Sequence, residues 1–196
     1  MNVSSFEVEV KVAIKDPKDI EQKLMELGAV RTNRETQTDI YFNHPCKSFQ
    51  DTDEALRLRN REKISISNQA GNVPATKLEL TYKGPKLDAT TKTRFELSVG
   101  VRDAESIRAI LLHLGFQEVA TIVKDRTFYI IEDKVISIDN VHQVGVFLEV
   151  EKVVLSEDMI SSTREKILTF LENIGLRRQD SIRESYLELF LRKQHT

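Results

Sequence analysis

The strongest constraint on how this chain folds is an alternation of charged and apolar residues that opens the sequence and then recurs. Residues 7–12 read Glu-Val-Glu-Val-Lys-Val. Successive side chains of an extended chain point to opposite faces, so Glu7, Glu9 and Lys11 share one face and the valines share the other. Alternation of this length predicts strands. Further strands are expected around Tyr41-Phe42 and over residues 55–59, 77–83, 93–99, 122–131, 135–139 and 146–153.

Helical patterns separate these strands. Apolar residues at helical spacing predict helices over residues 16–27, 103–114, 156–174 and 184–192. The first begins at Pro17 and ends before Gly28, which is the usual asymmetry of helix ends. The order strand, helix, Leu-Gly, strand occurs twice, at Gly28 and at Gly115, and indicates two related halves of one structure. Residues 65–76 and 84–91 are expected to be loops.

Packing considerations turn this pattern into a fold. The helices need an apolar surface to cover, and the apolar face of the strands is the one that can supply it. The charged face is then either open to water, as in an antiparallel sheet with one wet side, or turned into the interior of a closed barrel. Recurrence of the pattern favours the second. We expect an α+β fold: one domain over residues 1–196, with a closed antiparallel eight-stranded β-barrel and helices packed on the outside.

A charged interior calls for a charged ligand, because buried ions cost several kcal/mol each unless they are paired. Arginine and lysine in number suit phosphate groups, and carboxylates beside them suit a hard divalent cation such as Mg²⁺ or Mn²⁺. The expected basic lining is Lys11, Arg57, Arg59, Lys77, Lys83, Arg94, Lys124 and Arg126. The expected acidic lining is Glu7, Glu9, Glu79, Glu96, Asp139, Glu149 and Glu151. Together the two groups indicate a metal–polyphosphate complex.

Composition excludes several other classes of protein. The formal net charge is −2, so no global basic field attracts nucleic acid. No stretch approaches the roughly 20 apolar residues that span a bilayer, and the first residues do not form a signal peptide. The single cysteine, Cys46, rules out an internal disulfide framework. We therefore expect a cytoplasmic protein with no nucleic-acid or membrane partner.

An ordered set of motifs resembles the CYTH superfamily, the triphosphate tunnel enzymes, and is most similar to its class IV adenylyl cyclases. The Glu7-Val8-Glu9-Val10-Lys11 segment matches the ExExK signature of that superfamily. The other motifs follow in family order: Asp39-Ile40-Tyr41-Phe42, Leu56-Arg57-Leu58-Arg59, Tyr82-Lys83-Gly84-Pro85, Arg94-Phe95-Glu96, Lys124-Asp125-Arg126, Asp139, residues 145–151 and Ser185-Tyr186-Leu187-Glu188-Leu189. They span almost the whole chain.

The resemblance implies roles for individual residues. It implies catalytic roles for Lys11, Lys124, Arg126 and Glu149. It implies triphosphate binding by Lys11, Arg57, Arg59, Lys83, Arg94, Lys124 and Arg126. It implies that Mg²⁺ or Mn²⁺ is held by Glu7, Glu9, Asp139, Glu149 and Glu151. A homodimer is also implied.

Two chemistries remain open for the predicted tunnel. A class IV adenylyl cyclase converts ATP to cyclic AMP and pyrophosphate, and this is the activity that we expect. The alternative within the same fold is a phosphohydrolase acting on inorganic tripolyphosphate, thiamine triphosphate or a nucleoside triphosphate. The alternative of another class is a non-catalytic protein that binds a triphosphate. Positioning and electrostatic stabilisation would carry most of the catalysis in either enzyme.

Overall fold

A computed structural model describes residues 6–64, 77–86 and 94–194 of the chain. Its strands are β1 (Phe6–Ala13), β2 (Val30–Asn43), β3 (Ala55–Lys63), β4 (Lys77–Lys86), β5 (Arg94–Val101), β6 (Gln117–Ile131), β7 (Lys134–Val141) and β8 (Gly145–Val154). Its helices are α1 (Pro17–Glu26), α2 (Ala104–His113), α3 (Met159–Asn173), the short 3-10 helix η1 (Arg178–Asp180) and α4 (Tyr186–Gln194). No described helix is long and apolar enough to cross a membrane.

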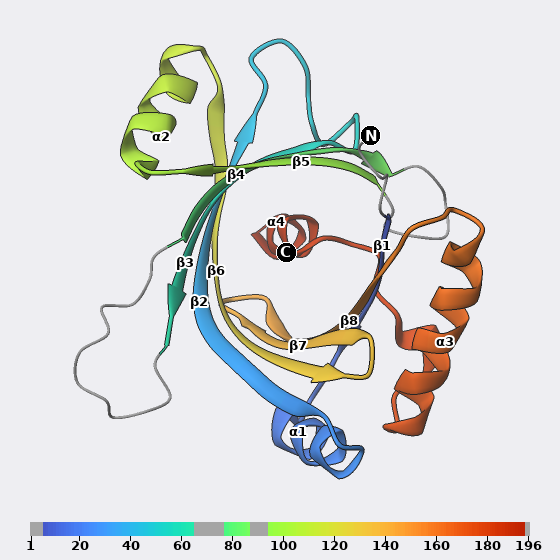
Figure 1. Cartoon of the computed structure of the whole chain (residues 1–196). Coiled ribbons are helices and arrows are strands. Elements are labelled where there is room, and N and C mark those ends of the chain that lie inside the picture. Colours follow the sequence, from blue (N-terminus) through green and yellow to red (C-terminus); the bar gives the residue numbers. More distant parts are fainter. Residues whose placement is uncertain (1–5, 65–76, 87–93, 195–196) are drawn as a thin grey trace.

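All eight strands belong to one antiparallel sheet, in the order β1-β8-β7-β6-β2-β3-β4-β5. The sheet curls around a central space (Figure 1). Its predicted α+β class and eight strands are confirmed. Complete closure is not, because no hydrogen-bonded pair joins the edge strands β1 and β5 anywhere in the part of the chain that the structure describes.

Like charges lie on either side of this gap between the edge strands. Burial raises the pKa of Glu7 on β1, and the carboxylates of Glu9 and Glu96, the latter on β5, raise it further. Lys83, which donates to Glu96, lowers the pKa of Glu7, so a cation also lies near this gap.

The internal repeat is confirmed. Asp16 caps α1 and Asp103 caps α2, each accepting hydrogen bonds from two backbone N–H groups of the first turn. Both helices end at a glycine in the left-handed region, with φ of 86° at Gly28 and 89° at Gly115. The strands that follow, β2 and β6, pair with each other in the middle of the sheet. Each half of the sheet therefore combines three strands of one repeat unit with the first strand of the other: β1 joins β6–β8, and β5 joins β2–β4.

The apolar core lies outside the curled sheet, as predicted. In its largest cluster, Leu24 of α1 and Leu171 of α3 pack with Val10, Ile136 and Leu148, which all point away from the charged face. A smaller cluster joins α2 to β2 and β3. Each strand presents alternate residues to these helices, so the remaining residues face the central space.

The last helix, α4, departs from the prediction that helices pack on the outside. It lies within the curl of the sheet (Figure 1). Tyr186 and Leu189 of α4 are buried there with Ile122, Val141 and Phe147. These sheet residues are inward-facing but apolar, so one end of the central space is built to receive a helix rather than an ion.

Element boundaries differ from expectation at a few places. Strand β6 begins at Gln117, five residues before the predicted start at Ile122, and η1 was not predicted. Residues 84–86 belong to β4 rather than to a loop, across a register shift between Lys83 and Lys86. The predicted loops over residues 65–76 and 87–91 lie outside the described residues.

Candidate functional site: a charged cavity inside the sheet

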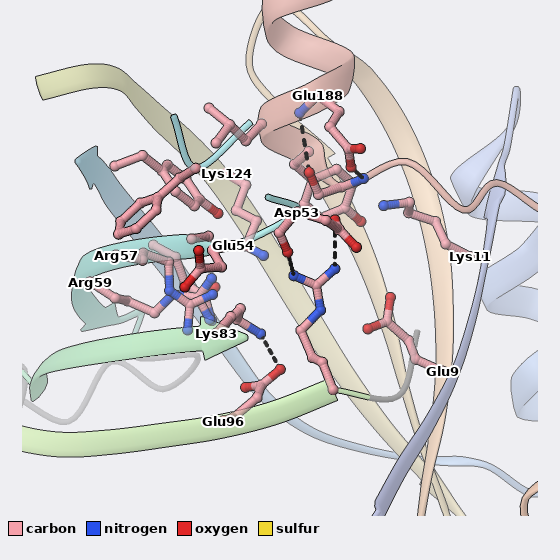
Figure 2. Close-up of a pocket in the computed structure, with 18 of the residues that line it drawn as sticks. Glu9, Lys11, Asp53, Glu54, Arg57, Arg59, Lys83, Glu96, Lys124 and Glu188 are labelled. Atoms are coloured by element: carbon pink, nitrogen blue, oxygen red, sulfur yellow. Dashed lines mark hydrogen bonds and ion pairs between the residues drawn. The ribbon is translucent and has the colours of Figure 1, made fainter. Parts of the chain in front are cut away.

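A cavity of about 870 Å³ occupies the space within the curled sheet. Figure 2 shows Glu9 and Lys11 on β1 facing across it toward Arg57, Arg59 and Lys83. The cavity brings together thirteen of the fifteen residues that were expected to line the interior: Glu7, Glu9, Lys11, Arg57, Arg59, Glu79, Lys83, Arg94, Glu96, Lys124, Arg126, Glu149 and Glu151. The predicted charged interior is therefore present.

Asp139 is the exception among the predicted site residues. It is completely buried and does not line the cavity. Arg126 donates to it from Nε at 2.6 Å and also from its Nη2 atom, and the same Nη2 contacts Glu149. Asp139 thus acts from behind the cavity wall, where it orients the guanidinium of Arg126. The structure gives it this ionic role and does not place it among the carboxylates that face the cavity.

A second carboxylate–guanidinium pair lies on β2 and β3. Asp39 is directly opposite Arg59 in the register and accepts from its Nε and Nη2 at 2.5 and 2.6 Å. Burial alone would raise the pKa of Asp39, but the Arg59 guanidinium holds it well below its usual range. Cross-strand opposition of Asp39 and Arg59 is the signal that could have assigned this pairing from the sequence.

Arg57 is held much more loosely than Arg59. Its Nε is buried without a hydrogen-bond partner, and its nearest carboxylate is Glu79 at 3.9 Å from Nη2. Burial and the neighbouring charge of Arg59 lower the pKa of Arg57. A buried guanidinium with an unfilled donor, aimed into a cavity, is suited to an anionic ligand.

Two lysines occupy the wall beside α4. Lys11 is 1% exposed and lies 3.9 Å from Glu149; Lys124 is 3% exposed and lies 3.7 Å from Asp139. Burial, assisted by the charge of Arg126, lowers the pKa of Lys124 to about 7. Lys124 can therefore exchange a proton near neutral pH.

The predicted metal ligands that face the cavity lie on the neighbouring strands β1 and β8. Glu9 is opposite Glu151 in the register, and Lys11 is opposite Glu149. Burial raises the pKa of Glu151 to about 7, and the charges of Glu7 and Glu9 contribute. This surplus of negative charge fits a cation. Even so, no three acidic, histidine or cysteine side chains in the described ranges converge in a ligand geometry, so the protein alone does not complete a metal site.

The mouth of the cavity is lined by ion pairs. Lys83 donates to Glu96, which is opposite it on β5, at 2.5 Å (Figure 2). Arg94 lies 3.6 Å from Asp53, which belongs to the connection between β2 and β3. Lys83 and Arg94, both predicted to bind phosphate, therefore already form ion pairs with carboxylates of the protein. Lys77, also predicted to line the interior, is not part of the cavity wall.

Two buried polar residues of β2 were not predicted from the sequence. Gln37 is fully buried, lines the cavity and leaves its Oε1 without a hydrogen-bond partner. Its amide donates to Glu35, which is also buried. Neutral and acidic residues alternate here with threonine and isoleucine, so the strand did not show the mixed-charge pattern used to identify the others.

Comparison with known proteins identifies the class to which this fold and site belong. A family model described as the CYTH domain matches residues 5–186. Because the match covers nearly the whole chain, the protein belongs to the CYTH domain family, and the resemblance seen in its motifs is confirmed.

Individual relatives agree with this membership. The chain is 39% identical over 184 residues to a Methanocaldococcus jannaschii protein provisionally named an adenylate cyclase, covering 94% of this chain and 98% of that one. A solved structure of a Pyrococcus horikoshii protein has a TM-score of 0.83 and 37% identity, covering 95% and 99% of the two chains.

A more distant structure shares the fold alone. It is a Hippeastrum adenylyl cyclase-like protein described as having a dominant triphosphatase activity, with a TM-score of 0.62 and 15% identity. It covers 97% of this chain and 96% of its own.

Proposed function

We propose that this protein is a metal-dependent enzyme that acts on a triphosphate bound inside the curled sheet. The observation that carries the proposal is the convergence of buried cations from separate strands on one cavity. Lys11, Arg57 and Lys124 are each less than a tenth exposed. Arg57 keeps an unfilled donor, and the pKa values of Arg57 and Lys124 are lowered. A bound anion would offset the cost of burying the charges of Arg57 and Lys124.

The favoured reaction is cyclisation of ATP to cyclic AMP and pyrophosphate. The ribose 3′-oxygen attacks the α-phosphorus, the bond from that phosphorus to the bridging oxygen breaks, and pyrophosphate departs. The 3′-hydroxyl proton passes to solvent water, and Lys124 in its charged form helps to hold the phosphate chain. The name given to the Methanocaldococcus relative supports this choice.

The basic residues position the phosphate chain. Arg57 and Arg59 approach it from β3 and Lys11 from β1, on opposite sides of the cavity. Arg126 is oriented by Asp139 and stabilises the negative charge that develops on the phosphoryl oxygens. These residues hold the reacting groups in line, which is the main requirement of phosphoryl transfer.

Mg²⁺ or Mn²⁺ is proposed as the cofactor. Glu7, Glu9, Glu149 and Glu151 would hold it together with phosphate oxygens, since the carboxylates alone do not complete a coordination sphere. When bound, the ion supplies Lewis-acid polarisation of a phosphoryl oxygen and neutralises charge on the leaving group.

Hydrolysis of a triphosphate is the second candidate. The triphosphatase activity described for the Hippeastrum protein favours it. Water would replace the ribose oxygen as nucleophile and attack the terminal phosphorus, while the same cations held the chain.

Product analysis tests the proposal. The purified protein is offered ATP and, separately, inorganic tripolyphosphate, each with Mg²⁺ and with Mn²⁺. Cyclic AMP with equimolar pyrophosphate is expected from ATP; orthophosphate would identify the hydrolase instead. Tight binding of either compound without product would indicate a non-catalytic triphosphate-binding protein. A protein that neither binds nor turns over these compounds would overturn the proposal.

A further inference from the structure

Tyr186, the first residue of α4, lies against both buried lysines of the cavity. The residue is 8% exposed, and the centroid of its ring is 4.1 Å from Nζ of Lys11 and 4.8 Å from Nζ of Lys124. Ammonium groups within about 6 Å of an aromatic ring are attracted by the negative charge of its face. One side chain from the end of the chain therefore contacts cations on β1 and β6 at once.

The hydroxyl of Tyr186 adds a third contact. It donates a hydrogen bond of 2.8 Å to Oδ2 of Asp139 on β7. Burial, together with the carboxylates of Glu149 and Asp139, raises the pKa of Tyr186 well above its usual value, so the hydroxyl stays a donor throughout the working pH range. The same carboxylate of Asp139 lies 3.7 Å from Lys124 and accepts from Arg126.

The backbone that precedes Tyr186 is tied to the same lysine. The N–H of Ile182 donates to the carbonyl oxygen of Lys11 at 2.7 Å, and Ser181 forms an isolated antiparallel bridge with Val12. Ser185 immediately precedes α4, and its hydroxyl oxygen accepts a hydrogen bond from the N–H of Glu188 at 3.2 Å. The position of the ring is thus fixed relative to β1 by main-chain hydrogen bonds.

An aliphatic side chain in place of Tyr186 would not attract the two ammonium groups. The wall around Lys124 also holds Arg126 and Arg59, whose charges oppose its protonation, and Asp39 and Asp139, which favour it. A leucine side chain could occupy the space, but it carries no negative face to attract ammonium groups. The placement of one ring beside two lysines is therefore more specific than core packing requires.

We propose that Tyr186 is a positioning residue that holds the ammonium groups of Lys11 and Lys124 in place for the phosphate chain. The inference rests on the proposed triphosphate site, and it assigns a binding role to a residue of the terminal helix. Tyr186 acts through the lysines and need not touch the substrate.

Two substitutions distinguish the effect of the aromatic face of Tyr186 from the effect of filling the same space. Tyr186→Phe keeps the aromatic face and loses the hydroxyl; Tyr186→Leu keeps an apolar side chain and loses the face. Calorimetry gives the Kd for tripolyphosphate, and kinetics give kcat and KM for the triphosphate that is turned over. Tyr186→Leu is expected to raise Kd and KM about tenfold, the size of two cation–π contacts, whereas Tyr186→Phe should stay within about threefold of the wild type.

Two matched controls accompany these variants. Leu189→Ala removes a buried aliphatic side chain of the same helix, which has no aromatic face to offer the two lysines, so it reports the cost of loosening α4. Tyr129→Phe removes a tyrosine–carboxylate hydrogen bond, that of Tyr129 to Glu21, outside the cavity. Thermal melts establish that each variant folds, and Tyr186→Met serves as the aliphatic variant should Tyr186→Leu not fold.

The outcomes separate this inference from the function on which it rests. If the wild type shows neither binding nor turnover, the proposed function is overturned. Wild-type binding together with an unchanged Kd in Tyr186→Leu would overturn the positioning role alone. Equal losses in Tyr186→Leu and Leu189→Ala would also overturn it, because helix packing would then explain the effect. Loss in Tyr186→Leu with near-normal Tyr186→Phe and Leu189→Ala supports it.

Discussion

The two halves of the sheet have the same topology but are stabilised and charged differently. We call β1, β6, β7 and β8 the covered half, because α1 and α3 pack on the outer face of its strands. We call β2–β5 the exposed half. On β5 the outward side chains of Phe95, Leu97 and Val99 are 60%, 64% and 56% exposed, and the core beneath α2 is small.

The inner faces of the two halves differ in a complementary way. Acids predominate on β1 and β8 of the covered half, at Glu7, Glu9, Glu149 and Glu151. Bases predominate on β3 of the exposed half. Two halves with the same strand arrangement therefore carry different linings, a cation-attracting wall on β1 and β8 and an anion-attracting wall on β3. The comparison teaches that apolar cover on the outer face and charge on the inner face are distributed separately over the two halves.

The largest expected effect separates two arginines of the exposed half. Arg59→Met strips the buried Asp39 of its guanidinium and should cost about 3–5 kcal/mol of unfolding free energy. Arg57→Met removes a cation with a buried, unfilled donor and should leave the melting temperature unchanged or raise it. It should also weaken tripolyphosphate binding about tenfold. Denaturant melts and calorimetry measure both effects. Equal destabilisation by the two changes would mean that Arg57 is held for stability.

Leucines on the outer faces test the difference in coverage. Leu148→Ala, in the core of the covered half, should destabilise by about 2–5 kcal/mol, because it empties space under well-packed helices. Leu97→Ala on β5 should change stability by less than about 0.5 kcal/mol. The comparison is made by urea unfolding. A large loss from Leu97→Ala would show that the face of β5 is buried in solution.

Glutamates on the inner faces test the difference in charge. Glu149→Gln should reduce turnover about a hundredfold or more, because this carboxylate faces the cavity and contacts both Lys11 and Arg126. Glu79→Gln on β4 should cost less than about fivefold, because Glu79 already pairs with Arg61 at 3.0 Å. Initial rates report turnover, and a thermal melt of each variant reports folding. Wild-type turnover in Glu149→Gln would remove that residue from the site.

The smallest effect concerns pH. The folded-state pKa of Glu151, about 7, lies above the unfolded value near 4.5, so the folded protein binds the extra proton between these limits. Stability should therefore fall as pH rises from about 5 to 8, by roughly 1–2 kcal/mol after allowance for solvent exposure. Glu151→Gln should flatten this slope and melt higher than the wild type at pH 8. The melts are run with a chelator present. A slope that Glu151→Gln leaves intact would place its origin in another group.

Much of this arrangement could be predicted from the sequence because side-chain alternation is local. In the strands that carry Glu7, Arg57 and Glu149, alternation over a few residues is enough to identify the inward face. Capping residues likewise mark the ends of α1 and α2. The eight-stranded sheet and the convergence of its charges follow from those local patterns.

What the sequence did not show depends on contacts between distant segments. Asp139 is acidic and inward-facing, like Glu149. It is nevertheless buried outside the cavity lining, where it accepts hydrogen bonds from Arg126 and from the hydroxyl of Tyr186. The placement of α4 inside the sheet depends on Phe147 and Ile122, whose apolar side chains look like ordinary core in a linear pattern. The gap between β1 and β5 depends on how the two ends of the sheet meet, which neither strand encodes alone.

Among the described residues no ladder hydrogen bond joins β1 to β5, and this has one further consequence. In a ring of hydrogen-bonded strands the diameter is fixed by strand number and stagger. Described strands β1 and β5 can move apart without breaking a ladder hydrogen bond between them. For the proposed triphosphate site, this freedom would let the width of the cavity change with the ligand that it holds.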